Sequence, residues 1–305
     1  MAAGKKALAR VAALASAFVL LLCVVDAAAA SATTTTTPAE AVAAVPAATT
    51  ITDQSTQYFV KLWSNMYPLK YVWSGKDICK YEGISCDTVK QTVTMLLVKF
   101  GITGTIPRFG SKPGFTPSNV RVITMNLMGN PGLTGTFPEH YGQLTWLQEL
   151  YLMGTSLQGT IPQAWNSLSN LVTLDVSNTK ACGNLPAWDA KGLKSLKYMN
   201  FKGNDLMKGT VPASLATFGA ISFETSGCHF CGCIPVEFST SIYMTMQLAR
   251  SQPQMNAADC ATANACTPEN LRCNAKSNAA AIGYSRASAA AVVASVLVTV
   301  ALLLS

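Results

Sequence analysis

The sequence predicts a solenoid: parallel β-strands form the concave face, irregular or 3-10 segments form the convex side, and a cysteine-bearing cap closes each end. The main observation is a Gly-x-apolar-Pro motif that occurs six times, with prolines 31, 24, 24, 26 and 23 residues apart. Recurrence near one period indicates stacked structural repeats. The copies are Gly104–Pro107, Gly135–Pro138, Gly159–Pro162, Gly183–Pro186, Gly209–Pro212 and Gly232–Pro235.

The clearest repeat runs from Leu147 to Leu168. Leu150 and Leu152 are two residues apart, so a strand at this position points both leucines inward. One such strand cannot bury its apolar side alone, whereas stacked strands build a continuous core. The Leu-x-Gly-x-Ile-Pro segment that follows resembles that of leucine-rich repeats. We therefore expect six leucine-rich repeats over residues 91–238.

A cap is expected at each end of the stack, because the terminal repeats would otherwise expose their core. In the N-terminal cap, residues 53–90, apolar residues at helical spacing from Tyr58 to Met66 predict a helix that Pro68 ends. After Pro235 the motif fades, and residues 239–278 are expected to form a cysteine-rich C-terminal cap. Residues 108–118 are rich in Gly and Pro and predict a loop inserted after the first repeat.

The cysteines predict disulfides. Cys79 and Cys86 are expected to form a local bridge in the N-terminal cap. Cys182 and Cys231 share one repeat position but lie two repeats apart, about 10 Å, which is beyond the reach of a bridge. We therefore predict that Cys182 is a free thiol and that three disulfides join the other C-terminal cysteines. These are Cys228, Cys231, Cys233, Cys260, Cys266 and Cys273.

Both ends of the chain carry targeting patterns. A basic start followed by an apolar run predicts a signal peptide over residues 1–30, and residues 31–52 form a Thr/Ala/Pro-rich tether. Small residues around Asn278, a short polar spacer and an apolar tail predict a glycosylphosphatidylinositol (GPI) attachment signal. We expect lipidation at Asn278, with residues 279–305 as the removed propeptide. A transmembrane tail is the alternative.

Composition and charge exclude several classes of function. Only 12% of residues are charged. Residues 31–278 contain 18 basic and 14 acidic residues, and this small positive net charge does not indicate a nucleic-acid partner. The two histidines, His140 and His229, do not follow a nucleophile motif. A zinc site at Cys228–Cys233 is less favoured than disulfides in a secreted chain. No catalytic residue, metal ligand or cofactor is predicted, and the protein is expected to bind rather than to catalyse.

The predicted binding site lies on the concave face, whose outward side chains form three columns. The first column is Thr94, Thr124, Glu149, Thr173, Tyr198 and Ser222; the second is Leu96, Asn126, Tyr151, Asp175, Asn200 and Glu224; the third is Val98, Met128, Met153, Ser177, Lys202 and Ser226. An exposed apolar patch with an aromatic anchor suggests a partner site. The candidate ligand-binding residues are Tyr151, Met128, Met153, Leu96, Asn126, Glu149, Asp175, Tyr198, Asn200 and Lys202.

Two alternatives remain open. The N-terminal cap or the insertion could fold over the apolar patch. Six lysines, which crowd two adjacent repeats, offer a basic flank as a second surface for acidic partners. They are Lys180, Lys191, Lys194, Lys197, Lys202 and Lys208.

The signal, the repeats, the cysteine-rich part and the tail together resemble the promastigote surface antigen family of trypanosomatids. Thr155–Trp165 and Leu174–Thr179 carry the resemblance best. It implies a GPI-anchored coat protein on the outer leaflet of the plasma membrane, with a host receptor or complement component as partner. The chain departs from the family in having few repeats and no Thr/Pro-rich stalk. Plant extracellular inhibitors and receptor ectodomains share the Ile-Pro repeat and the Trp73–Cys86 cap, and are the alternative.

Overall fold

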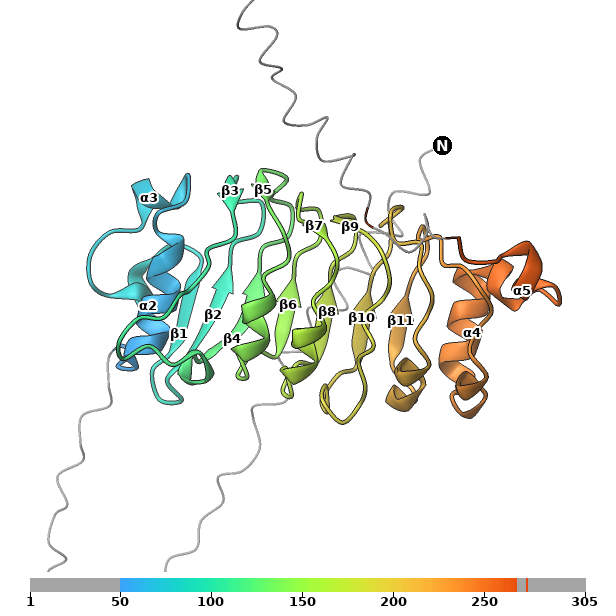
Figure 1. The fold of residues 1–305 in the computed structure, drawn as a ribbon. Helices are drawn as coiled ribbons and strands as arrows, with labels where there is room; N and C mark the ends of the chain where they lie inside the picture. The colour runs from blue at the N-terminus through green and yellow to red at the C-terminus, as the bar shows by residue number, and fades with distance from the viewer. Residues whose placement is uncertain (1–49, 268–272, 274–305) are drawn as a thin grey trace, which may run out of the picture. The chain divides into compact units, whose positions relative to one another are not determined.

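The computed structural model describes residues 50–267 and Cys273, which form a leucine-rich-repeat solenoid (Figure 1). Its main sheet has seven strands in the order β1-β2-β4-β6-β8-β10-β11. Strand β1 is antiparallel to β2, and every other neighbour in the sheet is parallel. The strands are β1 (Ile84–Asp87), β2 (Thr92–Leu96), β4 (Val122–Asn126), β6 (Glu149–Tyr151), β8 (Thr173–Asp175), β10 (Tyr198–Asn200) and β11 (Ser222–Glu224).

The register of the sheet is the one that the sequence predicts. Glu149 pairs with Thr124 and Thr173, and Tyr151 pairs with Asn126 and Asp175, so the first two columns are in phase across the six repeats. Backbone hydrogen bonds such as Gly129 N to Met153 O (2.8 Å) continue the stack at the third column. The alternate residues, including Leu150 and Leu152, are buried in the core.

Short strands form a second border of the solenoid, which we call the lateral edge. Strand β3 (Gly104–Thr105) pairs with β5 (Leu133–Thr134), and β7 (Gln158–Gly159) pairs with β9 (Lys180–Ala181). They follow the carboxyl ends of the main strands, and Figure 1 shows them along the upper border. We include α3 (Leu69–Val72) and residues 205–209 in this edge, because backbone bridges link Tyr67 to Thr103 and Cys182 to Leu206.

The convex side consists of short 3-10 segments and, in the fourth repeat, irregular chain, as expected for repeats whose motif proline ends strand pairing. The 3-10 segments are η2 (Pro117–Asn119), η3 (Glu139–Gln143), η4 (Gln163–Ser167), η5 (Ala213–Phe218) and η6 (Val236–Thr240). The motif glycines Gly135 and Gly159 have φ of 94° and 93°, a backbone conformation that is strained for residues with a Cβ atom. Glycine at this position therefore allows each repeat to turn from the lateral edge to the convex side.

A column of buried polar side chains, the core ladder, runs through the repeats just after the concave strands. Its members are Asn130, Thr155, Thr179, Asn204 and Cys228. Asn130 Nδ2 donates to Leu127 O (2.8 Å) in its own repeat and to Leu97 O (2.7 Å) in the preceding one. The ladder ends at Gln252, whose Nε2 donates to the carbonyls of Thr225 (2.8 Å) and Cys228 (3.0 Å). It satisfies backbone groups that would otherwise be buried without partners.

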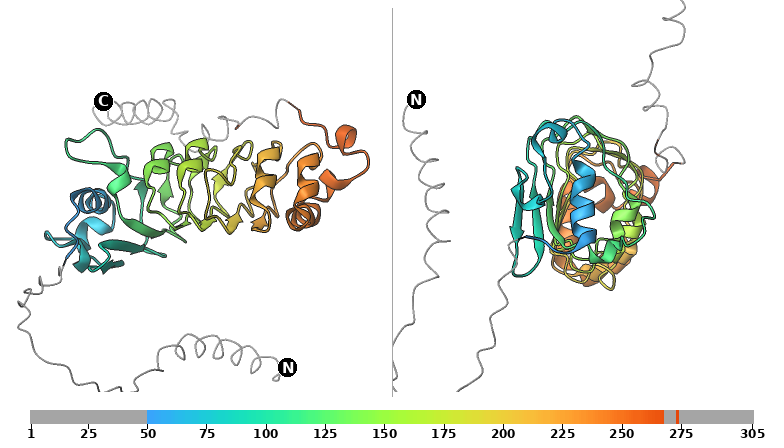
Figure 2. Two further views of the ribbon diagram at one scale, coloured as in Figure 1. Left: turned by 90° about the horizontal axis from the view of Figure 1, so that it is seen from below. Right: turned by 90° about the vertical axis from the view of Figure 1, so that its left-hand side faces the viewer.

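The N-terminal cap closes the first repeat with α2 (Gln54–Trp63), which lies across the end of the stack in Figure 2. Asp53 caps α2 by accepting from Thr56 N (2.6 Å). The cap also contains α3 and η1 (Ile78–Lys80), and Cys79 forms the predicted disulfide with Cys86.

The inserted loop does not cover the concave face. Phe109 stacks on Tyr141 of η3 at 5.7 Å between ring centroids, and Phe115 packs edge-on against Tyr58 of the cap at 4.9 Å. Both contacts hold the loop against the cap and the convex side. Leu96 on the concave face stays 48% exposed. The alternative that the insertion buries the apolar patch is therefore wrong.

The C-terminal cap contains α4 (Ile242–Ser251), η7 (Pro253–Asn256) and α5 (Cys260–Ala263). Helix α4 covers the outer border of β11: Gln247 Oε1 accepts from Phe223 N (2.7 Å) and its Nε2 donates to Ile221 O (2.9 Å). Disulfides join Cys231 to Cys266 and Cys233 to Cys260.

Two cysteines correct the sequence-based prediction. Cys182 is not a free thiol, because it is bonded to Cys273 with 5.2 Å between their Cα atoms. The prediction weighed only Cys231 as a partner and missed that the C-terminal chain returns to the fourth repeat. Cys228, predicted to be in a disulfide, is the free cysteine among the described residues. It belongs to the core ladder, and its Sγ lies 3.3 Å from Phe201 O.

The targeting predictions fall outside the described residues. This holds for the signal peptide, most of the tether, Asn278 and residues 279–305. Within the described part of the chain, no helix is long and apolar enough to span a bilayer.

Candidate functional site: the concave strand face

The apolar half of the concave face lies over β2, β4 and β6. Leu96 is exposed, and Met128, Tyr151 and Met153 are half-buried beside it. Met128 and Met153 are neighbours in the third column, because Gly129 N bonds to Met153 O. The predicted apolar candidates are therefore brought together on one accessible surface. Methionine side chains adapt to different partners, and a tyrosine adds a large contact area with a polar tip.

The polar half is less accessible than the sequence suggested. Asp175 and Asn200, predicted as ligand contacts, are each only 8% exposed. Asn200 Nδ2 donates to Asp175 Oδ2 (3.0 Å), and the two side chains also accept the backbone N–H groups of Ser177 (2.8 Å) and Lys202 (3.0 Å). They form the floor of the site rather than projecting from it. Direct contact of Asp175 and Asn200 with a ligand therefore stays a prediction, and the structure shows them as hydrogen-bonded and largely buried.

The accessible polar candidates surround this floor. Glu149 and Tyr198 are half-buried, Lys202 is exposed, and Asn126 is half-buried with its Oδ1 accepting from Met128 N (3.2 Å). Thr124 Oγ1 donates to Glu149 Oε2 (3.0 Å) and fixes that carboxylate. The Oγ of Ser177, which is 1% exposed, has no hydrogen-bond partner.

The electrostatics of this surface are dominated by carboxylates. Burial raises the pKa of Tyr151, and the charge of Glu149 raises it further. Burial and then Asp175 raise the pKa of Tyr198. The pKa of Glu224 is lowered, and the largest cause is the hydrogen bond that its carboxylate accepts from the Ser226 hydroxyl. Within residues 50–267, none of these three carboxylates has an ion-pair partner, so the surface favours donors and cations.

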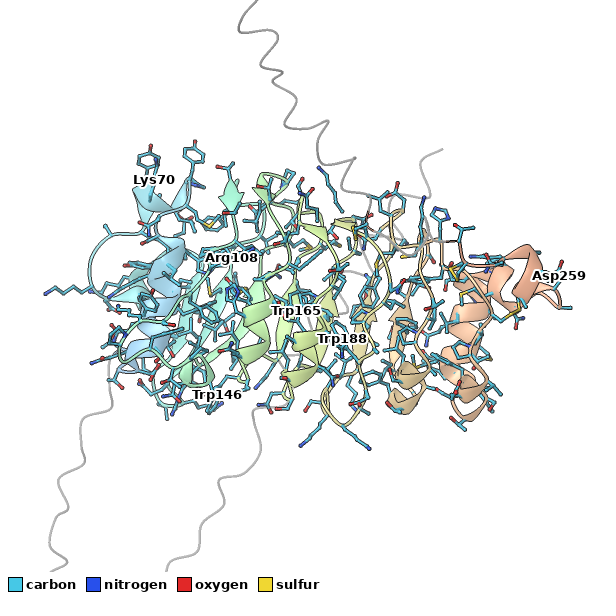
Figure 3. All side chains as sticks on the ribbon, in the orientation of Figure 1. Lys70, Arg108, Trp146, Trp165, Trp188 and Asp259 are labelled. Atoms are coloured by element: carbon cyan, nitrogen blue, oxygen red, sulfur yellow. A yellow bond between two sulfur atoms is a disulfide. The ribbon has the colours of Figure 1, made fainter. Side chains whose placement is uncertain are left out.

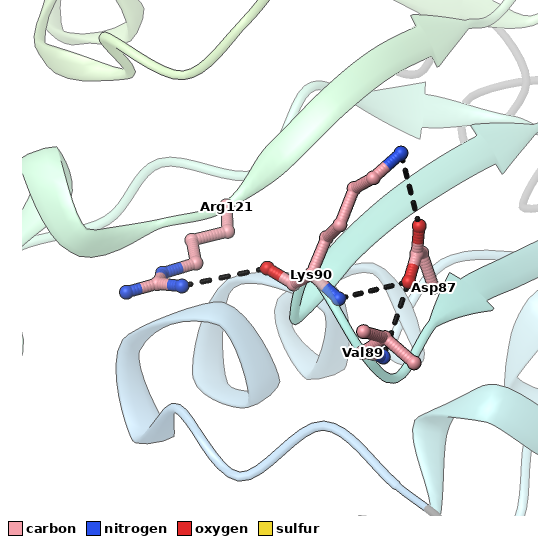
Figure 4. Close-up of polar contacts among 4 residues, drawn as sticks. All are labelled: Asp87, Val89, Lys90 and Arg121. Atoms are coloured by element: carbon pink, nitrogen blue, oxygen red, sulfur yellow. Dashed lines mark hydrogen bonds and ion pairs between the residues drawn. The ribbon is translucent and has the colours of Figure 1, made fainter. Parts of the chain in front are cut away.

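A feature that sequence reasoning missed lies at the start of the N-terminal strands. Trp146, labelled in Figure 3, is 37% exposed and lines a hollow of about 590 Å³. The Arg121 guanidinium lies 4.9 Å from its ring centroid. Arg121 Nη1 also donates to Lys90 O (3.5 Å) in the β1–β2 turn (Figure 4). Asp87 shapes that turn by accepting from Lys90 N (2.8 Å). The sequence could have indicated this feature, because Trp146 is a large aromatic residue directly before Leu147, at a position that does not face the core.

The lysine flank is split by the fold. Lys191, Lys194 and Lys197 are exposed before β10, on the border opposite the lateral edge. Lys180 and Lys208 belong to the lateral edge, whereas Lys202 lies on the concave face. The six residues therefore do not form one basic surface.

Only one of the two histidines packs against other side chains. His140 lies edge-on to Phe109 at 4.4 Å, and burial lowers its pKa, followed by the charge of Arg108. His229 is exposed between Cys228 and the disulfide-bonded Cys231. In the described ranges, no group of three or more histidine, cysteine or acidic side chains is arranged to hold a metal ion.

Comparisons with known proteins point to plant receptors. The chain is 32% identical over 165 residues to the receptor-like kinase TMK2 of Arabidopsis thaliana, and 26% identical over 161 residues to the receptor protein kinase WSS1 of Oryza sativa subsp. japonica. The matches cover 53% and 51% of this chain but only 15% and 14% of those proteins. No protein-family model matches the chain.

Among solved structures, the chain is similar to the leucine-rich-repeat ectodomain of the plant membrane receptor kinase GASSHO1/SCHENGEN3 from Arabidopsis thaliana. The TM-score is 0.52 at 25% identity, covering 61% of this chain and 23% of that one. These similarities support a leucine-rich-repeat protein of the receptor-ectodomain type. They do not support the resemblance to the promastigote surface antigen family.

Proposed function

We propose that this chain is an extracellular leucine-rich-repeat binding protein, lipid-anchored at Asn278, that captures a protein or peptide partner on its concave face. The observation that carries the proposal is the accessible apolar surface around Tyr151, directly beside carboxylates that have no ion-pair partner among the described residues. A partner that presents an apolar side chain next to a basic one fits this face, because the apolar side chain can contact the surface around Tyr151 and the basic one the carboxylates.

The similarity to receptor ectodomains supports a binding role over a catalytic one. The matched ectodomain of GASSHO1/SCHENGEN3 is in complex with CASPARIAN STRIP INTEGRITY FACTOR 2. Four disulfides among the described residues fit an oxidising compartment outside the cytosol. We therefore favour the plant-type function, in which the chain recognises a secreted protein, over the coat-antigen function.

The coat-antigen function is the second candidate, and the Thr155–Trp165 segment is the observation that favours it. Its partners would be a host receptor or a complement component. A binding screen with the protein released from cells should therefore include secreted hydrolases, peptide ligands, host receptors and complement proteins. The class of partner captured separates the two candidates.

Tyr151→Ala tests the concave face. We expect it to cost a captured partner roughly 1–3 kcal/mol of affinity, because an aromatic anchor at the centre of an interface carries much of the binding energy. The matched control is Tyr243→Ala, which removes a 49% exposed tyrosine from α4. Equal affinities for both variants and the unaltered chain would place the partner elsewhere.

The anchor is tested by treating intact cells with phosphatidylinositol-specific phospholipase C. Release of the protein, with a C-terminal peptide ending at Asn278 by mass spectrometry, is the expected result. Recovery of a peptide that extends to Arg286 or beyond would show that the tail is retained.

A further inference from the structure

The Cys182–Cys273 disulfide determines where the chain leaves the folded domain. Cys260, Cys266 and Cys273 are bonded in turn to Cys233, Cys231 and Cys182, so successive bridges step back from the sixth repeat to the fourth. Cys182 directly follows β9 on the lateral edge. The last described residue is therefore attached near the middle of the solenoid rather than at its C-terminal end.

The distance from this point to the proposed lipid is short. Asn278 is the fifth residue after Cys273, and five extended residues span at most about 17 Å. The seven strands of the main sheet span about 29 Å at their usual spacing. A tether of this length, fixed near the middle of the stack, brings the lateral edge, rather than the C-terminal end of the stack, close to the membrane.

The side chains of the lateral edge suit the surface of a bilayer. Tyr67 beside α3 is 53% exposed, Tyr71 and Val72 within it are 69% and 48% exposed, and Leu206 at the other end is 36% exposed. Tyrosines are enriched where proteins meet lipid headgroups, because their rings are apolar and their hydroxyls polar. The charged residues of this edge are Lys70, Lys180, Asp205 and Lys208.

The lysines of the edge match the phosphate groups of lipids. Lys70 lies at the border where Figure 3 labels it, with its Nζ 4.8 Å from the Tyr71 ring centroid. Between the lysines lie short strands with exposed residues such as Thr105, whose hydroxyl can donate to headgroup phosphates. Long lysine side chains can lay their apolar stems along this surface and extend their charges to phosphate.

We infer that the lateral edge is the membrane-facing side of this protein, so that the solenoid lies along the outer leaflet instead of standing on its C-terminal cap. The inference rests on the proposed anchor at Asn278. The occupant of the surface is the headgroup layer of the membrane that holds the anchor. In this orientation the concave face opens sideways and stays accessible to a partner.

Lysine labelling of the anchored protein tests the orientation. Intact cells and phospholipase-released protein are treated with a small water-soluble acylating reagent, and modification is measured by mass spectrometry. We expect Lys70, Lys180 and Lys208 to react several-fold less in the anchored protein than in the released one. The internal control is Lys191, Lys194 and Lys197, which lie on the opposite border and should react equally in both. Equal protection of both sets, or of neither, would overturn the inference.

The result distinguishes this inference from the proposed function. A protein absent from the membrane fraction refutes the anchor, whereas an anchored protein with uniformly reactive lysines refutes only the orientation. In intact cells, the ratio between the two lysine sets is informative whichever anchor is present.

A double variant tests the role of the disulfide. Cys182→Ser with Cys273→Ser lengthens the tether to the 12 residues after Cys266, about 40 Å when extended. The variant should remain anchored but lose the protection of Lys180 and Lys208. Protection that persists in a folded, anchored variant would show that the disulfide does not set the orientation.

Discussion

Removing the Cys182–Cys273 bridge should destabilise the solenoid more than removing the bridge in the N-terminal cap. The two half-cystines are 91 residues apart, but the Cys231–Cys266 bridge shortens the connecting path by 35 residues, leaving a loop of about 57. Closing a loop of that length removes enough unfolded-state entropy to stabilise the fold by about 4 kcal/mol. The Cys79–Cys86 bridge spans 7 residues, which corresponds to about 2.4 kcal/mol.

The assay is equilibrium unfolding of the purified protein in urea, followed by tryptophan fluorescence. Trp165 and Trp188 are buried in the repeats and Trp63 and Trp73 in the N-terminal cap, so the emission reports on both parts of the fold (Figure 3). The variant with Cys182→Ser and Cys273→Ser is compared with a variant that carries Cys79→Ser and Cys86→Ser. If the cap variant loses as much stability as the repeat variant, or more, the loop-entropy reasoning is refuted.

The remaining predictions concern the core and its titrating groups. Leu152→Ala should lower the free energy of unfolding by about 2–5 kcal/mol, because it leaves a cavity in the stacked core, and denaturant titration measures the loss. Burial raises the pKa of Tyr141 well above its ordinary value. The unfolded chain therefore loses the tyrosine proton first, and the stability of the fold falls as the pH rises above about 10. Tyr141→Phe should reduce this loss of stability at alkaline pH, as measured by melting curves at a series of pH values. Burial also raises the pKa of Cys228 to about 12, so iodoacetamide should label this thiol only after unfolding, and labelling of the native protein would contradict its buried position. Cys228→Ala should cost about 0.5–1.5 kcal/mol, since it removes one of two donors to Phe201 O and leaves the bond from Asn204 Nδ2 (2.7 Å) in place, whereas Cys228→Ser should cost less; equal losses would mean that the thiol only fills space.

The repeat register could be predicted because it follows from local periodicity. Leu150 and Leu152 fix which side of one strand points inward, and the motif spacing then repeats that assignment in the neighbouring strands. The same logic placed Met128, Tyr151 and Met153 on one surface. No long-range information was needed, since each repeat contacts mainly its neighbours.

The features that the sequence did not reveal depend on contacts between repeats or on the non-repeating end. Asp175 and Asn200 look like exposed polar residues, but a hydrogen bond between adjacent strands buries both. The core ladder escaped notice because its members differ in side chain while sharing a position. The Cys182 pairing depends on the path of the C-terminal chain, which no periodicity describes.

The two ends of the main sheet have a consequence for how copies of this protein behave when crowded. An open parallel sheet invites the next molecule to add its own strand, which is how fibres grow. Here β1 reverses direction at one end, so a strand from another copy that runs in the direction of the repeats would lie antiparallel to β1 and could not continue the parallel repeat-to-repeat stack. At the other end Gln247 already occupies the free Phe223 N–H and Ile221 carbonyl. Both ends thus resist head-to-tail polymerisation, even at high surface density.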